Sequence, residues 1–349
     1  MKKKLSLLLA FCFGVFLPCA LLSSCAKKPS PYSAHSFDYF DTVTTVTGYA
    51  EDQEAFDAVS AEIFALLGEY HRLFTVYERY DGLNNLCTLN ETKPPRAIPV
   101  DERIIDLLLF AKEMHRKTDG SINVAMGSVL SIWHEYREAG TDEPWAAVLP
   151  PQDQLREASA HTNIDDVVID EANGTVMLAD PDMRLDVGAI AKGYAVEMVA
   201  RALEEKGISG YVINAGGNVR TVGPKAGGEK WKVGIENPAD DPASPYVAYI
   251  RLSGESIVTS GSYQRYYVVD GKRYHHIIDP QTLSPSDRYL SLSVICKSSA
   301  LGDALSTALF CMSHEDGKRL VESLDGVEAM WVFPDGDKRY SDGFSAYRD

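Results

Sequence analysis

The chain has 349 residues, with 34 Lys and Arg against 50 Asp and Glu, so its formal net charge is −16. Apolar residues make up 45% and charged residues 24%, values that exclude a disordered, collagen-like or coiled-coil chain. The acidic balance argues against a nucleic-acid-binding protein, because such proteins need a basic surface to displace counterions from phosphates. A small anionic ligand would need a local group that offsets its charge.

The N-terminal segment has the three parts of a bacterial secretory signal. Lysines at positions 2–4 precede an apolar run over residues 5–22, and small residues follow. The sequence Leu22-Ser23-Ser24-Cys25 resembles a lipobox, in which the signal is cut before a cysteine that becomes lipid-modified. We therefore expect a signal peptide over residues 1–24, a lipid on Cys25, and a protein anchored to the cell membrane outside the cytoplasm.

The residues after the signal predict a tether and one domain. Residues 25–36 are polar and contain Pro and Ser, as linkers do, so we expect residues 37–349 to form the domain. An uncleaved N-terminal anchor is the alternative, but Pro18 and the small residues at the exit favour cleavage. The remaining cysteines, at positions 87, 296 and 311, have no metal-ligand spacing and predict neither a zinc site nor a disulfide framework.

Helices and strands are predicted to alternate irregularly along the domain. Apolar residues at helical spacing predict helices over residues 54–74, over 101–117 with Asp101 as cap, over 190–206, and over 299–312. A hairpin is predicted over 163–178, with its turn at Asn173-Gly174. Further strands are predicted at residues 40–49, 211–214, 247–252, 263–269, 292–296 and 327–333. This order favours an α/β domain of the α+β, mixed-sheet kind over a doubly wound one.

The segment 184–194, RLDVGAIAKGY, is the first candidate site. It places two glycines and Lys192 where a helix is expected to begin, and helix-start N–H groups beside a lysine can hold a phosphate. The Gly-Lys-Ser/Thr ending of a P-loop is absent, which excludes a nucleoside-triphosphatase site of that kind. Taken alone, the segment is equally consistent with a tight turn that carries a surface lysine.

Two glycine-containing segments follow. Residues 214–218, NAGGN, come after a short apolar strand and predict a turn. Thr259, Ser260 and Gly261 also predict a polar turn, and Asp270-Gly271 predicts a hairpin.

Two adjacent histidines follow that hairpin. Neighbouring residues of a strand face opposite ways, so at most one of His275 and His276 can serve a given site. A histidine followed by Asp279-Pro280 could act as a general base near a phosphoryl acceptor. A histidine that is merely hydrogen-bonded at the surface or in the core is the alternative.

The last candidate pair is Asp303 and Thr307. On a helix these residues are four apart, so their side-chain oxygens lie on one face. Hard oxygens at that spacing suit Mg²⁺, which completes its shell with water and substrate phosphates. A structural Asp with a Thr bonded back to the helix is the alternative. A cation site, a phosphate cradle and a base together are the equipment of phosphoryl or nucleotidyl transfer.

The order of these motifs resembles the ApbE family, the FAD:protein FMN transferases. The most specific matches are LDVGAIAKGYAVE (185–197), VTSGSYQRYY (258–267), HHIIDPQT (275–282) and DALSTAL (303–309), within a resemblance that spans residues 37–347. The family implies one α/β domain that binds FAD with Mg²⁺ and transfers FMN through a phosphoester to a Thr or Ser hydroxyl of a target protein, releasing AMP. Targets implied by the family are extracytoplasmic flavoproteins, such as subunits of membrane electron-transfer complexes.

The resemblance also implies roles for individual residues. It implies that Asp303 and Thr307 ligate Mg²⁺ by side chain and that Ala189 does so by its carbonyl. His276 is expected to activate the acceptor hydroxyl, with Asp279 orienting it. The residues implied to contact FAD or line its pocket are Tyr77, Ser121, Ile122, Asn123, Asp186, Lys192, Thr259 and Ile277.

Three motifs depart from the family pattern. A frequent Gly-Gly-Asp is Gly216-Gly217-Asn218 here, the turn after Asp279 has Leu283 in place of Gly, and residues 121–123 read Ser-Ile-Asn in place of Ala-Phe-Asp. Two other functions use the same donor pocket: a Mg²⁺-dependent FAD pyrophosphatase that yields FMN and AMP, and a non-catalytic FAD-binding lipoprotein.

Overall fold

The computed structural model describes residues 30–239 and 241–349. The predicted signal peptide, the lipidation site Cys25 and residues 25–29 of the predicted linker lie outside the described residues. Within the described part of the chain, no helix combines the length and apolar character needed to cross a bilayer.

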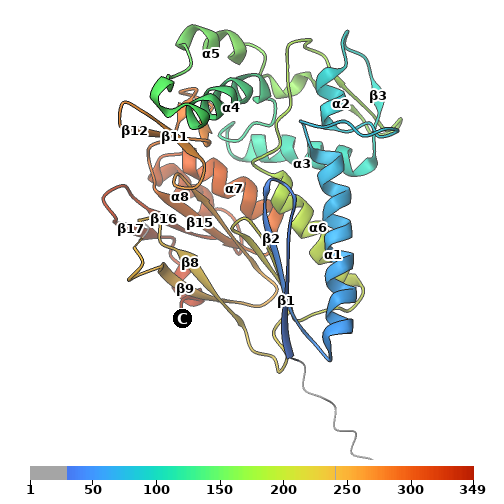
Figure 1. Ribbon diagram of the computed structural model, residues 1–349, viewed down its shortest axis with the longest axis vertical. Helices are drawn as coiled ribbons and strands as arrows, with labels where there is room; N and C mark the ends of the chain where they lie inside the picture. The colour runs from blue at the N-terminus through green and yellow to red at the C-terminus, as the bar shows by residue number, and fades with distance from the viewer. Residues whose placement is uncertain (1–29, 240) are drawn as a thin grey trace, which may run out of the picture.

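An eight-stranded antiparallel sheet forms the centre of the fold (Figure 1). Its strands, in spatial order, are β1 (Ser30–Tyr39), β2 (Thr42–Ala50), β6 (Tyr211–Ala215), β7 (Asn218–Val222), β10 (Ser256–Gly261), β15 (Ser291–Cys296), β16 (Glu328–Val332) and β17 (Lys338–Tyr340). Smaller sheets comprise β3 (Ile98–Pro99), β4 (Val167–Asp170) and β5 (Thr175–Leu178); β8 (Trp231–Glu236) and β9 (Tyr246–Leu252); β11 (Tyr266–Val269) and β12 (Lys272–His275); and β13 (Ile278–Asp279) and β14 (Ser284–Pro285).

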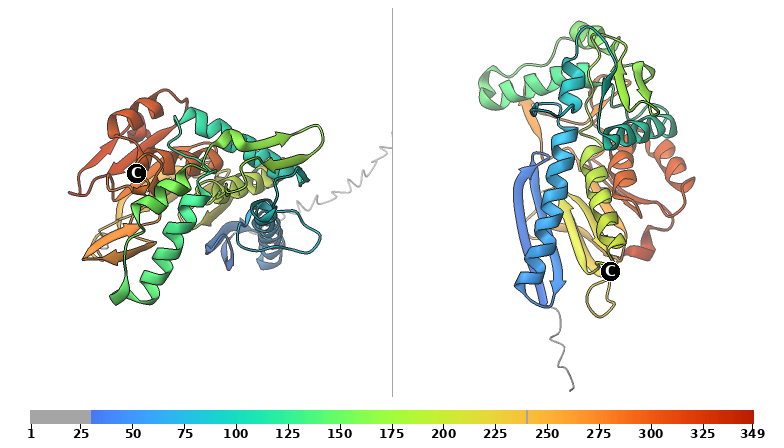
Figure 2. Two further views of the ribbon diagram at one scale, coloured as in Figure 1. Left: turned by 90° about the horizontal axis from the view of Figure 1, so that it is seen from above. Right: turned by 90° about the vertical axis from the view of Figure 1, so that its right-hand side faces the viewer.

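The described residues form eight α-helices, and three of the longer ones cover one face of the large sheet. The longer ones are α1 (Gln53–Phe74), α3 (Glu102–Lys117), α4 (Gly127–Asp142), α6 (Ala191–Glu205) and α7 (Ser299–Cys311), and the shorter ones are α2 (Leu86–Glu91), α5 (Gln152–Ser159) and α8 (His314–Glu322). Helices α1, α6 and α7 lie in one layer against the sheet (Figure 2). The β8–β9 hairpin covers apolar residues on the opposite face, among them Val219, Ile257 and Met330. The α+β prediction is confirmed, with antiparallel pairing throughout the large sheet.

Most of the predicted elements are present with small shifts at their ends. Helix α1 begins one residue earlier than expected, and Asp101 caps α3 by accepting from Arg103 N–H. The β4–β5 hairpin pairs Val168 with Met177, as predicted across Asn173-Gly174. Gly216 and Gly217 form the predicted turn, with φ of 57° and 88°, between β6 and β7.

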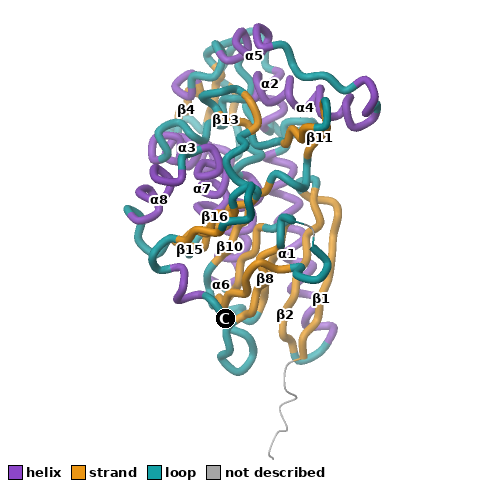
Figure 3. Tube along the Cα trace, turned by 90° about the vertical axis from the view of Figure 1, so that its left-hand side faces the viewer, coloured by secondary structure: helices purple, strands orange, loops and turns teal. Residues whose placement is uncertain are grey.

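Residues 30–36 were predicted to be part of the linker. That prediction is wrong, because these residues belong to strand β1. The strand pairs with β2 from Ser30 opposite Ala50 to Tyr39 opposite Thr42 (Figure 3). An edge strand needs only one partner and can keep polar side chains on its solvent face. Aromatic contacts hold it to α1, since the Tyr32 ring stacks on Phe56 at 5.6 Å and the Tyr39 ring stacks on Phe64 at 6.3 Å.

Thr259, Ser260 and Gly261 do not form the predicted turn. They end strand β10, near the middle of the sheet, where Thr259 pairs with Ser293 of β15. At this place inside the fold, side-chain hydroxyl groups are hydrogen-bonded to one another in pairs. Thr259 Oγ1 lies 2.8 Å from Ser293 Oγ, and Ser260 Oγ donates to Ser306 Oγ of α7 over 2.9 Å. Paired hydroxyls make a polar strand stable inside the fold, which the composition of the segment does not reveal.

Candidate active site

Helix α7 carries the predicted metal ligands, Asp303 and Thr307. Only 6% of the Asp303 side chain is exposed, and its Oδ2 accepts from the backbone N–H of Gly193 over 2.8 Å. The same oxygen lies 3.8 Å from Nζ of Lys192. Among the described residues, no donor takes Asp303 Oδ1 or Thr307 Oγ1. One carboxylate oxygen is therefore held by the protein, and the other is free for a ligand.

The start of α6 supplies the third predicted ligand. In a regular helix the N–H of Gly193 would bond to the carbonyl of Ala189, four residues earlier. It bonds to Asp303 instead, and within the described part of the chain nothing else donates to Ala189 O. Gly193 has no room for a side chain, because a Cβ there would meet Asp303 Cβ at 2.4 Å and Ser299 O at 2.5 Å.

These three unclaimed oxygens are the hard donors that Mg²⁺ prefers. They are Asp303 Oδ1, Thr307 Oγ1 and the Ala189 carbonyl. Burial raises the pKa of Asp303, whereas Lys192, the N–H of Gly193 and the side-chain amide of Asn218 lower it. A divalent cation would also favour the ionised carboxylate. The residues present therefore fit Mg²⁺.

Asp186 and Lys192 hold the turn that precedes α6. Asp186 Oδ1 accepts from Gly188 N–H over 2.8 Å, and Lys192 Nζ donates to Gly188 O over 3.3 Å. Burial raises the pKa of Asp186, and the hydrogen bond from Gly188 opposes that effect. The structure brings both residues to the same turn, and their contact with FAD stays a prediction.

The predicted segment 121–123 lies beside this turn. The backbone N–H of Asp186 donates to Val124 O over 2.8 Å, and Asn123 Nδ2 donates to Thr162 O over 2.8 Å. Ile122 is buried, and Ser121 is half-buried. Asn90 of α2, which the motif analysis missed, holds both the N–H and the carbonyl of Leu185, at 2.7 and 2.9 Å.

His276 follows β12 and is held by the main chain of Arg265. Its Nδ1 lies 3.3 Å from Arg265 O, and a carbonyl can only accept, so Nδ1 carries the proton and Nε2 is left as an acceptor. Burial, helped by the charge of Arg265, lowers the pKa of His276 to about 3. The imidazole is therefore neutral at physiological pH, as a general base must be.

The residues on either side of His276 in the chain are buried in the protein core. His275 bonds to Ser286 O at 2.7 Å and accepts from Ile277 N–H, and the Ile277 side chain is 5% exposed. Asp279 was expected to orient His276, and this is wrong. Its carboxylate accepts from Gln281 N–H over 2.8 Å and lies 3.7 Å from Arg288, so the carbonyl of Arg265 has the orienting role.

Helix α4 contributes two groups that the motif analysis did not find, His134 and Arg137. The predicted residue Tyr77, 69% exposed, lies with its ring centroid 5.6 Å from that of His134. Arg137 donates to Nδ1 of His134 over 2.7 Å. Helix α4 packs beside β11, which precedes His276 in the chain (Figures 1 and 3). The apolar residues Val129, Ile132 and Trp133 recur at helical spacing and are buried, but no motif marks the polar residues His134 and Arg137 between the turns of this helix.

A buried network of hydrogen-bonded polar side chains connects the elements that carry the candidate site. Ser299 Oγ donates to Oδ1 of Asn218, whose Nδ2 has no partner in the described part of the chain and lies beside Gly193. Glu197 of α6 accepts from Ser299 N–H at 2.8 Å and from Arg220 of β7 at 3.1 Å. The network thus joins β7, α6 and the start of α7.

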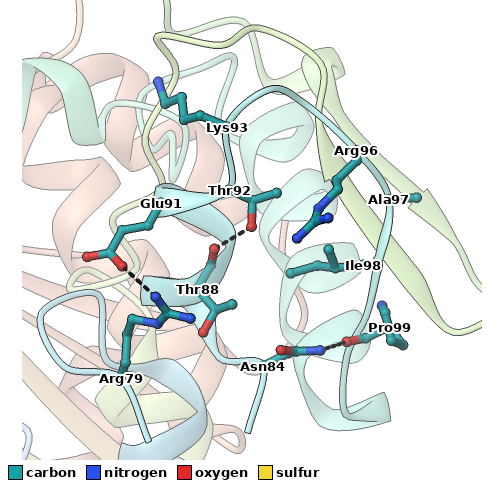
Figure 4. A pocket seen from close by; sticks show the side chains of 10 residues that line it. All are labelled: Arg79, Asn84, Thr88, Glu91, Thr92, Lys93, Arg96, Ala97, Ile98 and Pro99. Atoms are coloured by element: carbon teal, nitrogen blue, oxygen red, sulfur yellow. Dashed lines mark hydrogen bonds and ion pairs between the residues drawn. The ribbon is translucent and has the colours of Figure 1, made fainter.

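Two other features lie away from these groups. A surface hollow of about 480 Å³ is lined by residues of α2, of the loops before and after it and of β3, among them Arg79, Lys93 and Arg96, and by no predicted site residue (Figure 4). His161, Asp180 and Asp182 could bring three ligand atoms within 4.8 Å of one another. They are already engaged, since His161 pairs with Asp180 at 2.7 Å and Lys93 lies 3.8 Å from Asp182.

Comparison with known sequences decides the family. The ApbE family profile matches residues 40–331, most of the chain. The protein belongs to the ApbE family. Curated relatives include FAD:protein FMN transferases of Klebsiella pneumoniae, 32% identical with 79% of this chain and 82% of that protein covered, and of Treponema pallidum, 32% identical with 81% of each covered.

Solved structures of ApbE proteins have the same fold. The Thermotoga maritima ApbE protein is 28% identical, with a TM-score of 0.79 over 92% of this chain and all of its own. The flavin transferase ApbE from Vibrio cholerae is 25% identical, with a TM-score of 0.76 over 91% of this chain and 99% of its own. The predicted family and the predicted fold class are both confirmed.

Proposed function

We propose that this protein is a Mg²⁺-dependent FAD:protein FMN transferase, which moves FMN from FAD to a Thr or Ser hydroxyl of a target protein and releases AMP. Relatives that match about four-fifths of the chain are FAD:protein FMN transferases. One observation in the structure carries the proposal: the N–H of Gly193 and Lys192 hold Asp303 Oδ2 at the start of α6, where the Ala189 carbonyl has no donor among the described residues. Lys192 is also one of the charges that act on the neutral His276.

The reaction exchanges one phosphorus–oxygen bond for another. The acceptor oxygen bonds to the phosphorus of the FMN half, and the bond from that phosphorus to the bridging oxygen breaks, so the bridging oxygen leaves with AMP. Nε2 of His276 takes the hydroxyl proton, because Nδ1 is committed to Arg265 O. Lys192 lies where it can offset charge on the diphosphate.

Asp303, Thr307 and Ala189 would hold the Mg²⁺ ion. When bound, the ion neutralises charge on the diphosphate and on the leaving AMP. Gly193 holds Asp303 in place for this task, since its N–H occupies Oδ2 and leaves Oδ1 available. The acidic protein can thereby accept a dianionic substrate at one local site.

Incubation with FAD, Mg²⁺ and a candidate acceptor tests the proposal. The expected result is a fluorescent flavin band on the acceptor after denaturing electrophoresis, an acceptor mass increased by one FMN, and one AMP per flavin. Release of FMN and AMP without a labelled acceptor would identify a FAD pyrophosphatase. Binding of FAD without AMP release would identify a non-catalytic flavin-binding protein.

We also propose that Cys25 carries the lipid that anchors the protein to the membrane outside the cytoplasm, where it meets extracytoplasmic flavoproteins. The support is the lipobox-like sequence before Cys25. Cys25→Ser should move the protein from the detergent phase to the aqueous phase in a phase-partition experiment. Retention of Cys25→Ser in the detergent phase would contradict the anchor.

A further inference from the structure

Helix α4 carries a guanidinium that the described chain leaves without a counterion. Arg137 is half-buried, and it forms no ion pair with any carboxylate of the described residues. Its single hydrogen bond within those residues runs from Nη2 to Nδ1 of His134, over 2.7 Å. A guanidinium has five N–H donors, so most of its donors are free for a ligand.

His134 holds Arg137 in a defined orientation. Because a guanidinium only donates, Nδ1 of His134 accepts, and the ring proton is on Nε2. That nitrogen lies 3.0 Å from Oε1 of Glu138, one turn further along α4. Trp133 fixes the same helix to the loop after β13, since its Nε1 donates to Leu283 O over 2.8 Å. The free side of the guanidinium is therefore preorganised.

Positive charge is concentrated near His276, because the carbonyl of Arg265 holds this histidine and α4 packs against β11, the strand that directly follows Arg265. In addition to burial, the charges of Arg265, Arg137 and Lys192 lower the pKa of His276. Burial raises the pKa of Asp186, and Arg137 and Lys192 are among the charges that oppose this effect. Arg265 also pairs with Asp41 at 3.2 Å, but that side chain is 93% exposed. Burial, together with the charge of Arg265, lowers the pKa of Arg137. A half-buried excess of positive charge in a protein of net charge −16 is stabilised by an anion.

We propose that Arg137, assisted by Arg265, binds the phosphoryl group on the FMN side of the bond that is cleaved. This proposal rests on the proposed function. The phosphorus attacked by the acceptor hydroxyl must lie within reach of His276. Both arginines belong to segments next to that histidine, since the Arg265 carbonyl lies 3.3 Å from its Nδ1 and α4, which carries Arg137, packs against β11. A planar guanidinium can donate two parallel hydrogen bonds to two phosphate oxygens. Arg137 would then offset the charge of the non-bridging oxygens while the new oxygen–phosphorus bond forms and the bond to AMP breaks.

Binding of FMN and of riboflavin separates the phosphate contact from contacts to the flavin ring. The two ligands share the ring and the ribityl chain, and only FMN has the phosphate. In flavin-fluorescence titrations of the purified protein, Arg137→Gln should weaken FMN binding by about tenfold or more, since hydrogen bonds to charged groups are strong. Riboflavin and AMP binding should stay within about twofold of wild type, because a contact to the FMN phosphate contributes to neither.

Matched variants make the result specific. Arg319→Gln removes an arginine that is 73% exposed on α8 and should leave FMN binding unchanged. Arg137→Met keeps the packed stem and tests the same contact if Arg137→Gln does not fold. Wild-type FMN affinity in Arg137→Met, or an equal loss of FMN and riboflavin, overturns the proposal.

The outcome is distinguishable from failure of the proposed function. If the wild-type protein labels no acceptor but binds FMN more tightly than riboflavin in a manner that depends on Arg137, the phosphate site stands and the transferase assignment fails. If flavin is transferred while Arg137→Met binds FMN like the wild type, the transferase assignment stands and the phosphate site fails.

Discussion

The backbone N–H of Gly193 donates to Oδ2 of Asp303 over 2.8 Å and joins two helices whose residues are 110 positions apart in the chain. This bond frees the Ala189 carbonyl and occupies Asp303 Oδ2. It also brings Lys192, the next residue, to 3.8 Å from the same carboxylate. A single contact between α6 and α7 thus arranges the groups that we assign to the metal and the diphosphate.

Asp303→Asn should weaken Mg²⁺ binding more than about 100-fold, because loss of a ligand costs more than loss of a residue that only supports one. The measurement is the Mg²⁺ dependence of flavin transfer, together with the Mg²⁺-induced shift of the melting temperature. Asp287→Asn, at a side chain that is 84% exposed, is the control and should behave as wild type. Wild-type Mg²⁺ dependence in Asp303→Asn would remove this carboxylate from the site.

Gly193→Ala should destabilise the fold by about 1–3 kcal/mol, because overpacked sites force their neighbours apart. The new Cβ would meet Asp303, Ser299 and the amide of Asn218 at 2.4–2.7 Å. Urea unfolding measures the loss, and Mg²⁺ affinity should fall with it. Gly68→Ala on α1 faces a movable Tyr39 ring at 3.1 Å and should be neutral or stabilising, since alanine favours helices. Equal effects of the two substitutions would contradict the close helix crossing.

His276→Ala should slow flavin transfer by about 10²- to 10⁴-fold, the usual contribution of a general base. Because the pKa of His276 is about 3 in the free protein, the imidazole stays neutral from pH 5 to 8. Protonation of His276 should therefore not slow flavin transfer as the pH is lowered from 8 to 5. An anionic substrate opposite Arg265 offsets part of the repulsion, so FAD binding should raise the pKa of His276. Ring-proton NMR with and without FAD measures both values, and a lower value with FAD would contradict the arrangement.

The lowered pKa of His276 also makes the free energy of unfolding depend on pH. Folding favours the neutral imidazole, so the unfolded chain binds the extra proton first. The contribution of His276 to stability is complete above the unfolded-state pKa of about 6.5 and is lost as the pH falls below it. Urea unfolding from pH 7 to pH 5 should therefore show a steeper loss in wild type than in His276→Gln. Identical slopes would show that the imidazole is not desolvated.

The buried pair of Glu197 and Arg220 should be essential for the fold. Arg220→Met removes one partner of an ion pair that is 3–4% exposed, which leaves a buried charge and costs about 3–5 kcal/mol. Glu197 also binds Arg201, but that arginine is 56% exposed, so Arg201→Gln should cost less than about 1 kcal/mol. Both are measured by urea unfolding. A small effect of Arg220→Met would mean that the start of α7 does not depend on this network.

Local patterns predicted the elements whose residues are near one another in the chain. The apolar spacing predicted α1 and α3 within a residue of their observed starts, and Asn173-Gly174 predicted the β4–β5 hairpin. The i, i+4 spacing placed Asp303 and Thr307 on one helix face. Strands β1 and β10 were missed because their polar side chains find partners on neighbouring strands or on helix α7, which sequence spacing does not identify.

The sequence by itself determined the family, the acidic character of the chain and which residue types could bind metal and phosphate, because those properties depend on composition and on motifs of adjacent residues. Only the tertiary structure decided that Gly193 N–H turns to Asp303, that the carbonyl of Arg265 rather than Asp279 holds His276, and that α4 brings Arg137 to them. Such contacts depend on the order of strands in the sheet and on how closely helices cross, and packing of the whole domain sets both.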